Sequence, residues 1–215
     1  MNFYVLLRLA NCLTISRILM VPLFMLSFRY HRLFPLPALI SALVVFVVAS
    51  ITDYLDGRIA RKRGITSFGK FMDPLADKLL VGAALICFTR FENGLIPGWM
   101  VLTIIGREFV VTVLRIAFMA TQGAVVSASK WGKYKTSSQM SVIVISLILL
   151  VVYEYATASG ESVEWLIHPL GPIYFMMYIP LTLTVISGLE FLYKNRKAFY
   201  DLMRSVDSYD PADDI

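Results

Sequence analysis

The chain has 215 residues, 58% of them hydrophobic, and a mean hydropathy of +0.70, which excludes an ordinary soluble domain and indicates an integral membrane protein. Its net charge of +5 is dispersed between apolar runs, which favours anionic lipid headgroups and phosphates as partners over nucleic acid. Cys12 and Cys87 lie far apart within or beside apolar runs, so neither a disulfide framework nor a Cys/His metal site is predicted.

The apolar runs predict an all-α membrane protein, a bundle of about six transmembrane helices. Met1–Ala10 is amphipathic and predicts a short N-terminal helix in the membrane interface. The spans that follow approach the ~20 residues needed to cross a bilayer, allowing for polar ends. They are predicted at Ile18–Phe28, Leu36–Leu55, Phe71–Phe88, Ile96–Ala120, Met140–Tyr155 and Pro172–Tyr193.

A polar stretch precedes the first apolar segment. Asn11 and Thr14 can act as ordinary helix N-caps, and Arg17 can act as an interfacial anchor.

The stretch Thr52–Lys78 joins the second and third spans and contains four carboxylates, those of Asp53, Asp56, Asp73 and Asp77. On a helix Asp53 and Asp56 lie about 60° apart and share a face, on which small residues follow. Asp73 and Asp77 also share one face, which includes Gly69. If two helices presented these faces to each other, the four carboxylates would form a cage beside a surface made of small side chains.

Four carboxylates at close range cannot all ionise without positive partners. Hard divalent cations that prefer oxygen ligands, Mg²⁺ or Mn²⁺, would resolve this repulsion. A structural alternative is that Asp53 and Asp56 cap a helix or pair with neighbouring basic residues, but it leaves the set of four unexplained.

The fourth span contains Arg107, Glu108 and Arg115. The two arginines lie about 80° apart on a helix, so they can face one cavity. Their burial in a membrane is costly without anionic partners, and Glu108 can compensate only one of them. Snorkelling of Arg115 to the interface remains an alternative.

A donor-rich segment, Ser127–Gln139, follows the fourth span and alternates lysines with serine, threonine and glutamine. Lys130 and Lys135 within it suit an oxyanion such as phosphate. A generic basic loop is the alternative.

The distribution of Lys and Arg predicts the orientation. Most basic residues fall on one side of the membrane, whereas the other side has Arg29, Arg32 and Arg90 together with several glutamates. Both termini and the carboxylates are therefore expected on the cytoplasmic side.

The spacing D-x2-D-G-x2-A-R … G-x3-D-x3-D resembles the signature of the CDP-alcohol phosphotransferases, membrane enzymes that move a substituted phosphoryl group from a CDP-linked donor to an alcohol. Its members here are Asp53, Asp56, Gly57, Ala60, Arg61, Gly69, Asp73 and Asp77. The linker between Arg61 and Gly69, residues 62–68, is one residue shorter than the usual pattern. The segments around Thr14, Arg107 and Lys135 are most similar to the phosphatidylglycerophosphate synthases of this family.

The resemblance implies transfer of a phosphatidyl group from CDP-diacylglycerol to sn-glycerol 3-phosphate, with two metal ions bound by the four aspartates and Asp77 as the general base. The implied donor-binding residues are Thr14, Arg17, Asp56, Gly57, Ala60, Arg61 and Gly69. The implied acceptor-phosphate ligands are Arg107, Arg115, Lys130 and Lys135.

The resemblance also implies a homodimer in a bacterial cytoplasmic membrane. We expect residues 1–205 to form a single transmembrane catalytic domain and the acidic tail, residues 206–215, to be disordered. Alternatives are another acceptor (inositol phosphate, serine or phosphatidylglycerol) or, in a different class, a divalent-cation transporter.

Overall fold

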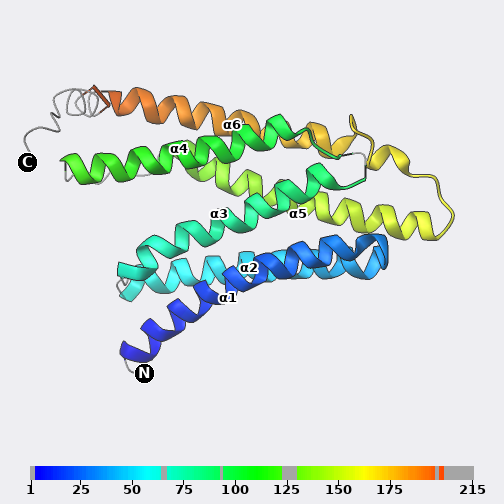
Figure 1. Cartoon of the computed structure of the whole chain (residues 1–215), viewed down its shortest axis with the longest axis horizontal. Coiled ribbons are helices and arrows are strands. Elements are labelled where there is room, and N and C mark those ends of the chain that lie inside the picture. Colours follow the sequence, from blue (N-terminus) through cyan, green and yellow to red (C-terminus); the bar gives the residue numbers. More distant parts are fainter. Residues whose placement is uncertain (1–2, 64–66, 93, 123–129, 197–198, 201–215) are drawn as a thin grey trace, which may run out of the picture. The chain divides into compact units, whose positions relative to one another are not determined.

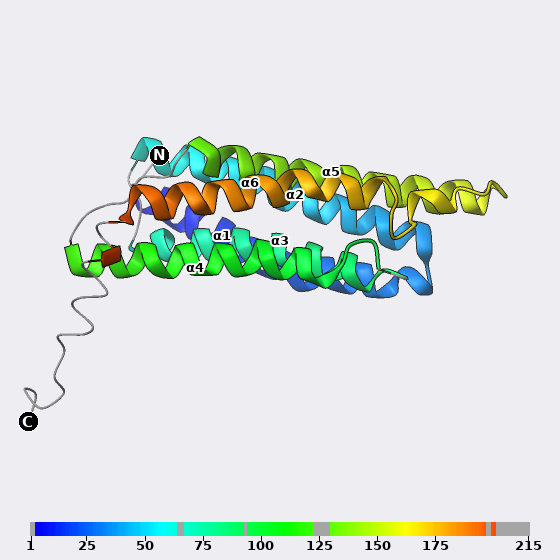
Figure 2. The ribbon, with the colours of Figure 1, turned by 90° about the horizontal axis from the view of Figure 1, so that it is seen from above.

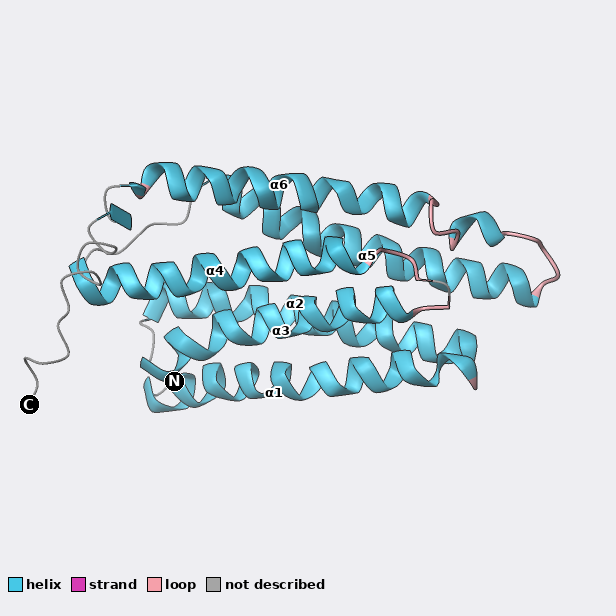
Figure 3. Ribbon diagram, turned by 45° about the horizontal axis from the view of Figure 1, so that its top comes forward, coloured by secondary structure: helices cyan, strands magenta, loops and turns pink. Residues whose placement is uncertain are grey.

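The computed structural model describes residues 3–63, 67–92, 94–122, 130–196 and 199–200; within its helices the side chains of residues 3–15, 53–63, 67–77, 119–122 and 130 lie outside the description. This part of the chain is helical, with turns and loops and no strand (Figure 3). Its α-helices are α1 (Phe3–Arg29), α2 (Pro35–Arg63), α3 (Ser67–Arg90), α4 (Gly98–Gln122), α5 (Lys130–Ala158) and α6 (Pro172–Lys194). The predicted all-α class is confirmed.

The N-terminal helix differs from the prediction of a separate interfacial helix at Met1–Ala10. The structure has one continuous helix, α1, from Phe3 to Arg29. No glycine or proline lies between Phe3 and Met20, so nothing in the local sequence forces a break before the apolar segment. The amphipathic and apolar stretches therefore belong to one element.

Three helices in the described part of the chain are long and apolar enough to cross a membrane. The qualifying stretches are Pro35–Thr52 in α2, Trp131–Ala158 in α5 and Pro172–Lys194 in α6. The membrane-capable stretch of α5 begins at Trp131, nine residues before the predicted start at Met140. The polar segment before Met140 is part of the same helix and is therefore included in this stretch.

The chain divides into two compact units, which are described in turn. The first comprises Met1–Val101 and Met140–Met177. Within it α1 packs against α2 and α3 (Figure 1, Figure 2).

An aromatic cluster fills the contact between α1 and its neighbours. Phe24 lies with its ring centroid 5.9 Å from that of Phe46 in α2, and Phe28 lies 6.0 Å from Phe88 in α3. These four side chains are at most 5% exposed. Between membrane helices such packing stabilises the unit through van der Waals contact between the rings.

The second unit comprises Leu102–Gln139 and Tyr178–Ile215, and therefore most of α4, the start of α5 and most of α6. Phe118 of α4 stacks on Phe191 of α6 with ring centroids 6.2 Å apart, and Val111 and Leu114 pack beside them. This apolar contact fixes α4 against α6.

Candidate functional site

The four aspartates lie on the backbone of two consecutive helices of the first unit. Asp53 and Asp56 fall within the last three turns of α2, and Asp73 and Asp77 fall within the first three turns of α3. Residues 64–66 connect the two helices, so the facing helix ends can be at most about 15 Å apart. All four aspartates are therefore in helices, as the prediction of shared carboxylate faces requires.

The side chains of these aspartates lie outside the described residues, so the four-carboxylate cage stays a prediction. The same holds for the side chains of Thr14 and Lys130 and for the small and basic motif residues Gly57, Ala60, Arg61 and Gly69. The chemistry of the donor set nevertheless fits Mg²⁺ or Mn²⁺, since aspartate supplies the hard oxygen ligands that these ions prefer. Among the side chains that the structure describes, no group of three or more His, Cys, Asp or Glu could hold a metal ion.

Arg17 is the predicted donor-site residue whose side chain is described. It lies on α1 in the first unit and is completely buried, with 0% exposure. Burial of a guanidinium is costly unless anionic or hydrogen-bonding groups compensate it. Arg17 is therefore not an anchor that snorkels to water, which favours the prediction of a role inside the protein.

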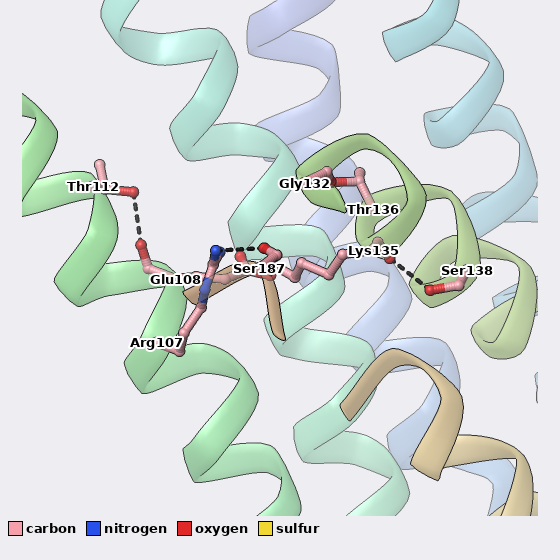
Figure 4. Close-up of polar contacts among 8 residues, drawn as sticks. All are labelled: Arg107, Glu108, Thr112, Gly132, Lys135, Thr136, Ser138 and Ser187. Carbon is pink, nitrogen blue, oxygen red and sulfur yellow. Dashed lines mark hydrogen bonds and ion pairs between the residues drawn. The ribbon is translucent and has the colours of Figure 1, made fainter. Parts of the chain in front are cut away.

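The second unit brings Glu108 of α4 and Lys135 of α5 together as an ion pair (Figure 4). The side chains of Lys135 and Glu108 are 6% and 14% exposed, so the pair is largely shielded from water. The sequence suggested Glu108 as a partner for one of the arginines. The structure adds Lys135 of another helix as its ion-pair partner, while the charge of Glu108 also acts on Arg107.

Arg107 instead contacts α6. Its Nη2 donates a hydrogen bond of 2.6 Å to Ser187 Oγ, and Ser187 is 1% exposed (Figure 4). Gly188, the next residue, lies against the same side chain, because a Cβ built on it would meet Arg107 Nε at 3.2 Å. The structure thus brings Arg107, Glu108 and Lys135 into one unit, together with two α6 residues that the sequence analysis missed.

The hydroxyl groups of α5 are less available for a ligand than the sequence suggested. Thr136 Oγ1 donates to the Gly132 carbonyl at 3.1 Å, and Ser138 Oγ donates to the Lys135 carbonyl at 2.8 Å. Both hydroxyl protons are therefore used within the helix. Gln139, one turn after Lys135, is 2% exposed, and its Nε2 has no hydrogen-bond partner in the described part of the chain.

Arg115 lies two turns beyond Arg107 on α4, about 12 Å along the helix axis. Its Nε is buried and has no hydrogen-bond partner among the described residues. The buried nitrogen makes Arg115 a candidate ligand for an anion, together with Arg107 and Lys135, whereas the partial exposure of the residue is equally compatible with snorkelling.

Residues 7–191 match the family model described as CDP-alcohol phosphatidyltransferase. The chain therefore belongs to this family, and the motif resemblance is confirmed. With its membrane-capable helices, membership of this membrane family identifies the chain as an integral membrane protein.

Two relatives are named CDP-diacylglycerol--glycerol-3-phosphate 3-phosphatidyltransferase. The protein from Bacillus subtilis (strain 168) is 40% identical over 202 residues, which cover 89% of this chain and 96% of the relative. The protein from Rickettsia felis (strain ATCC VR-1525 / URRWXCal2) is 37% identical over 193 residues, 89% of this chain and 97% of the relative.

A third relative, from Mycobacterium tuberculosis (strain CDC 1551 / Oshkosh), is named probable phosphatidylglycerophosphate synthase. It is 37% identical over 186 residues, 86% of this chain and 80% of the relative. No solved structure matches the chain.

Proposed function

We propose that this chain transfers the phosphatidyl group of CDP-diacylglycerol to sn-glycerol 3-phosphate, giving phosphatidylglycerophosphate and CMP. The observation that carries the proposal is the 40% identity, over nearly the full length of both chains, to a protein named for this reaction. All eight residues of the family signature are present in this chain.

The charges of the second unit support a phosphorylated acceptor. Arg107, Arg115 and Lys135 carry three positive charges and Glu108 one negative charge, so the group has a surplus of two. A phosphate monoester carries about −1.5 to −2 at neutral pH. A neutral acceptor such as glycerol, or a zwitterion such as serine, would leave this surplus largely uncompensated in a buried setting.

The donor side of the proposed site is built by α1, α2 and α3. Asp53, Asp56, Asp73 and Asp77 would hold two divalent ions, which supply positive charge against the donor pyrophosphate and the departing CMP. Gly57 and Ala60 have little or no side chain and would let the cytidine and ribose approach the helix backbone. Thr14, Arg17, Arg61 and Gly69 complete the proposed donor site.

Asp77 is the proposed general base. Its carboxylate would take the proton from the acceptor hydroxyl as that oxygen bonds to the lipid-linked phosphorus of the donor. The bond from this phosphorus to the oxygen of CMP breaks, and CMP leaves with the electron pair. Arg107, Arg115, Lys130 and Lys135 would hold the acceptor phosphate.

We further propose six transmembrane helices, with both termini and the site at the cytoplasmic face of a bacterial inner membrane, because the basic residues favour that orientation. There a water-soluble acceptor, a cytosolic nucleotide and a lipid tail can meet. The proposal includes a homodimer and a single catalytic domain over residues 1–205, both expected from the family resemblance. The C-terminal tail, residues 206–215, lies outside the described residues.

The reaction is tested with a panel of acceptors, one donor and CMP release as the measurement. Purified protein in detergent with CDP-diacylglycerol and Mg²⁺ or Mn²⁺ is expected to release CMP with glycerol 3-phosphate. We expect kcat/KM to be at least about tenfold lower with inositol phosphate, serine or phosphatidylglycerol than with glycerol 3-phosphate. Each of these acceptors differs from glycerol 3-phosphate in charge or shape and therefore fits the proposed acceptor site less well. Equal rates with inositol phosphate would assign the acceptor differently, and CMP release that needs no acceptor would contradict the transfer reaction.

Lys135 provides a test of the acceptor site. Lys135→Met is expected to raise the KM for glycerol 3-phosphate by about tenfold to a hundredfold, the loss that corresponds to one charged hydrogen bond. The KM for CDP-diacylglycerol is expected to change by less than about threefold, since the donor lies elsewhere.

Two further variants make this measurement specific. Lys133→Met, an exposed lysine two positions earlier on α5, is the matched control and is expected to leave both constants unchanged. Lys135→Met combined with Glu108→Gln removes the ion pair without leaving a buried acid near the phosphate. Parallel increases in both KM values in the double variant would contradict an acceptor site at Lys135.

A further inference from the structure

We infer that Ser187 and Gly188 of α6 are positioning residues, which hold the Arg107 guanidinium in place for the phosphate of the acceptor. The inference rests on the proposed function, in which Arg107 binds that phosphate. It concerns α6, to which neither the motif nor the proposed reaction assigns a role.

The hydrogen bond from Arg107 to Ser187 orients the guanidinium without cancelling its charge. Ser187 Oγ accepts from Arg107 Nη2 at 2.6 Å in a setting where Ser187 is 1% exposed. The neighbouring acid, Glu108, acts on Arg107 through its charge but forms its ion pair with Lys135. A neutral hydroxyl fixes the direction of the positive group and leaves its charge for an anionic ligand, whereas a carboxylate in the same position would compete with that ligand.

Gly188 provides the space that this orientation requires. A Cβ on Gly188 would lie 3.2 Å from Arg107 Nε and 3.4 Å from Arg107 Cγ, so the arginine side chain lies directly across the backbone of α6. In membrane helices a glycine lets another group approach the helix backbone closely. Ser187 and Gly188 together thus form a seat for Arg107, one by a hydrogen bond and the other by the absence of a side chain.

The seat leaves the guanidinium incompletely satisfied. Arg107 Nε is buried and has no hydrogen-bond partner among the residues that the structure describes. An arginine buried for structural reasons alone is normally surrounded by enough acceptors for its N–H groups. The incomplete set favours an anionic ligand as the missing partner.

The experiment compares steady-state constants of the full-length protein with CDP-diacylglycerol and glycerol 3-phosphate. Ser187→Ala is expected to raise the KM for glycerol 3-phosphate by about tenfold, with kcat and the KM for CDP-diacylglycerol changed by less than about twofold. Ser187→Thr retains a hydroxyl and is expected to recover most of the loss. Thr182→Ala is the matched control, because Thr182 is exposed on the same helix and bonds its own backbone.

Gly188→Ala tests the second half of the seat. The added methyl forces Arg107 to move by a few tenths of an ångström, so we expect a KM for glycerol 3-phosphate raised by about threefold. Gly98→Ala, at a helical glycine whose Cβ would meet nothing within 4 Å, is the matched control and is expected to leave the constants unchanged.

A double-mutant cycle with Arg107→Gln decides whether Ser187 acts through Arg107. If it does, Ser187→Ala has no further effect on the KM for glycerol 3-phosphate once Arg107 is replaced. Additive effects of the two replacements would overturn the inference, as would equal rises in both KM values or a threonine variant no better than alanine. Because KM reports only on folded enzyme, partial loss of stability does not mimic the expected coupling.

The two proposals fail in different ways. If the wild-type protein releases no CMP with any acceptor, the proposed function fails. If it prefers another phosphorylated acceptor, the same cycle is measured with that acceptor. If the wild type uses glycerol 3-phosphate and the cycle is additive, only the inference about Ser187 and Gly188 fails.

Discussion

Replacing Asp77 with asparagine is expected to lower kcat for CMP release by about 10²- to 10⁴-fold, the usual contribution of a positioned general base. The change preserves the shape of the side chain and one oxygen that can bind a metal, but it removes the group that accepts the proton of the acceptor hydroxyl. The measurement is CMP release by purified protein with CDP-diacylglycerol, saturating glycerol 3-phosphate and Mg²⁺ or Mn²⁺. Near-normal release would exclude Asp77 from this role.

A metal titration separates the role of a base from that of a metal ligand. If Asp77 served mainly as a ligand, a large excess of Mn²⁺ would restore much of the activity of the Asp77→Asn variant, since weakened binding is overcome by mass action. For a base we expect kcat to stay low at every metal concentration. Asp210→Asn, in the acidic tail to which no function is assigned, is the chemically matched control and is expected to be fully active.

Removal of divalent ions is expected to abolish the reaction. With a chelator in excess, we expect CMP release to fall by at least about a thousandfold, because the ions supply several kcal/mol of charge stabilisation in phosphoryl transfer. Mg²⁺ or Mn²⁺ added beyond the chelator is expected to restore the activity. Asp56→Asn and Asp73→Asn are expected to raise the metal concentration needed for half-maximal rate.

The chelator experiment needs a control for loss of structure. Circular dichroism and thermal unfolding, measured with and without chelator, show whether the helices persist when the ions are removed. Unimpaired turnover in chelator would contradict the assignment of Asp53, Asp56, Asp73 and Asp77 as metal ligands and would require another source of positive charge for the leaving CMP.

Helices were predictable where a long apolar run is bounded by polar residues. The sixth span, predicted at Pro172–Tyr193, agrees with α6 at Pro172–Lys194 to one residue. The start of α5 was less predictable, because a span is recognised by its apolar content whereas Lys130–Gln139 is polar and still helical. Lys135 and Gln139 recur four residues apart and are both buried, and this spacing is the available signal for a helix there.

The candidate site was predictable where a residue type is chemically out of place. Arg107 and Glu108 drew attention because charged groups are rare in apolar helices, and Lys135 because it lies in a donor-rich polar segment. Their partners were not predictable, because the ion pair of Glu108 depends on how α4 meets α5 and not on neighbours in the sequence. Ser187 and Gly188 gave no signal, since serine and glycine are common in membrane helices for packing reasons alone.

The two halves of the proposed site are assembled from segments that are synthesised at different times. The aspartates all come from a stretch of 25 residues, from Asp53 to Asp77, on two consecutive helices, so that half needs only a short loop to close. The seat of Arg107 combines α4 with α6, and Arg107 and Ser187 are 80 positions apart. A nascent chain that has been synthesised as far as the end of α3 therefore already contains all of its proposed metal ligands, whereas the seat of Arg107 is complete only after α6 has been made.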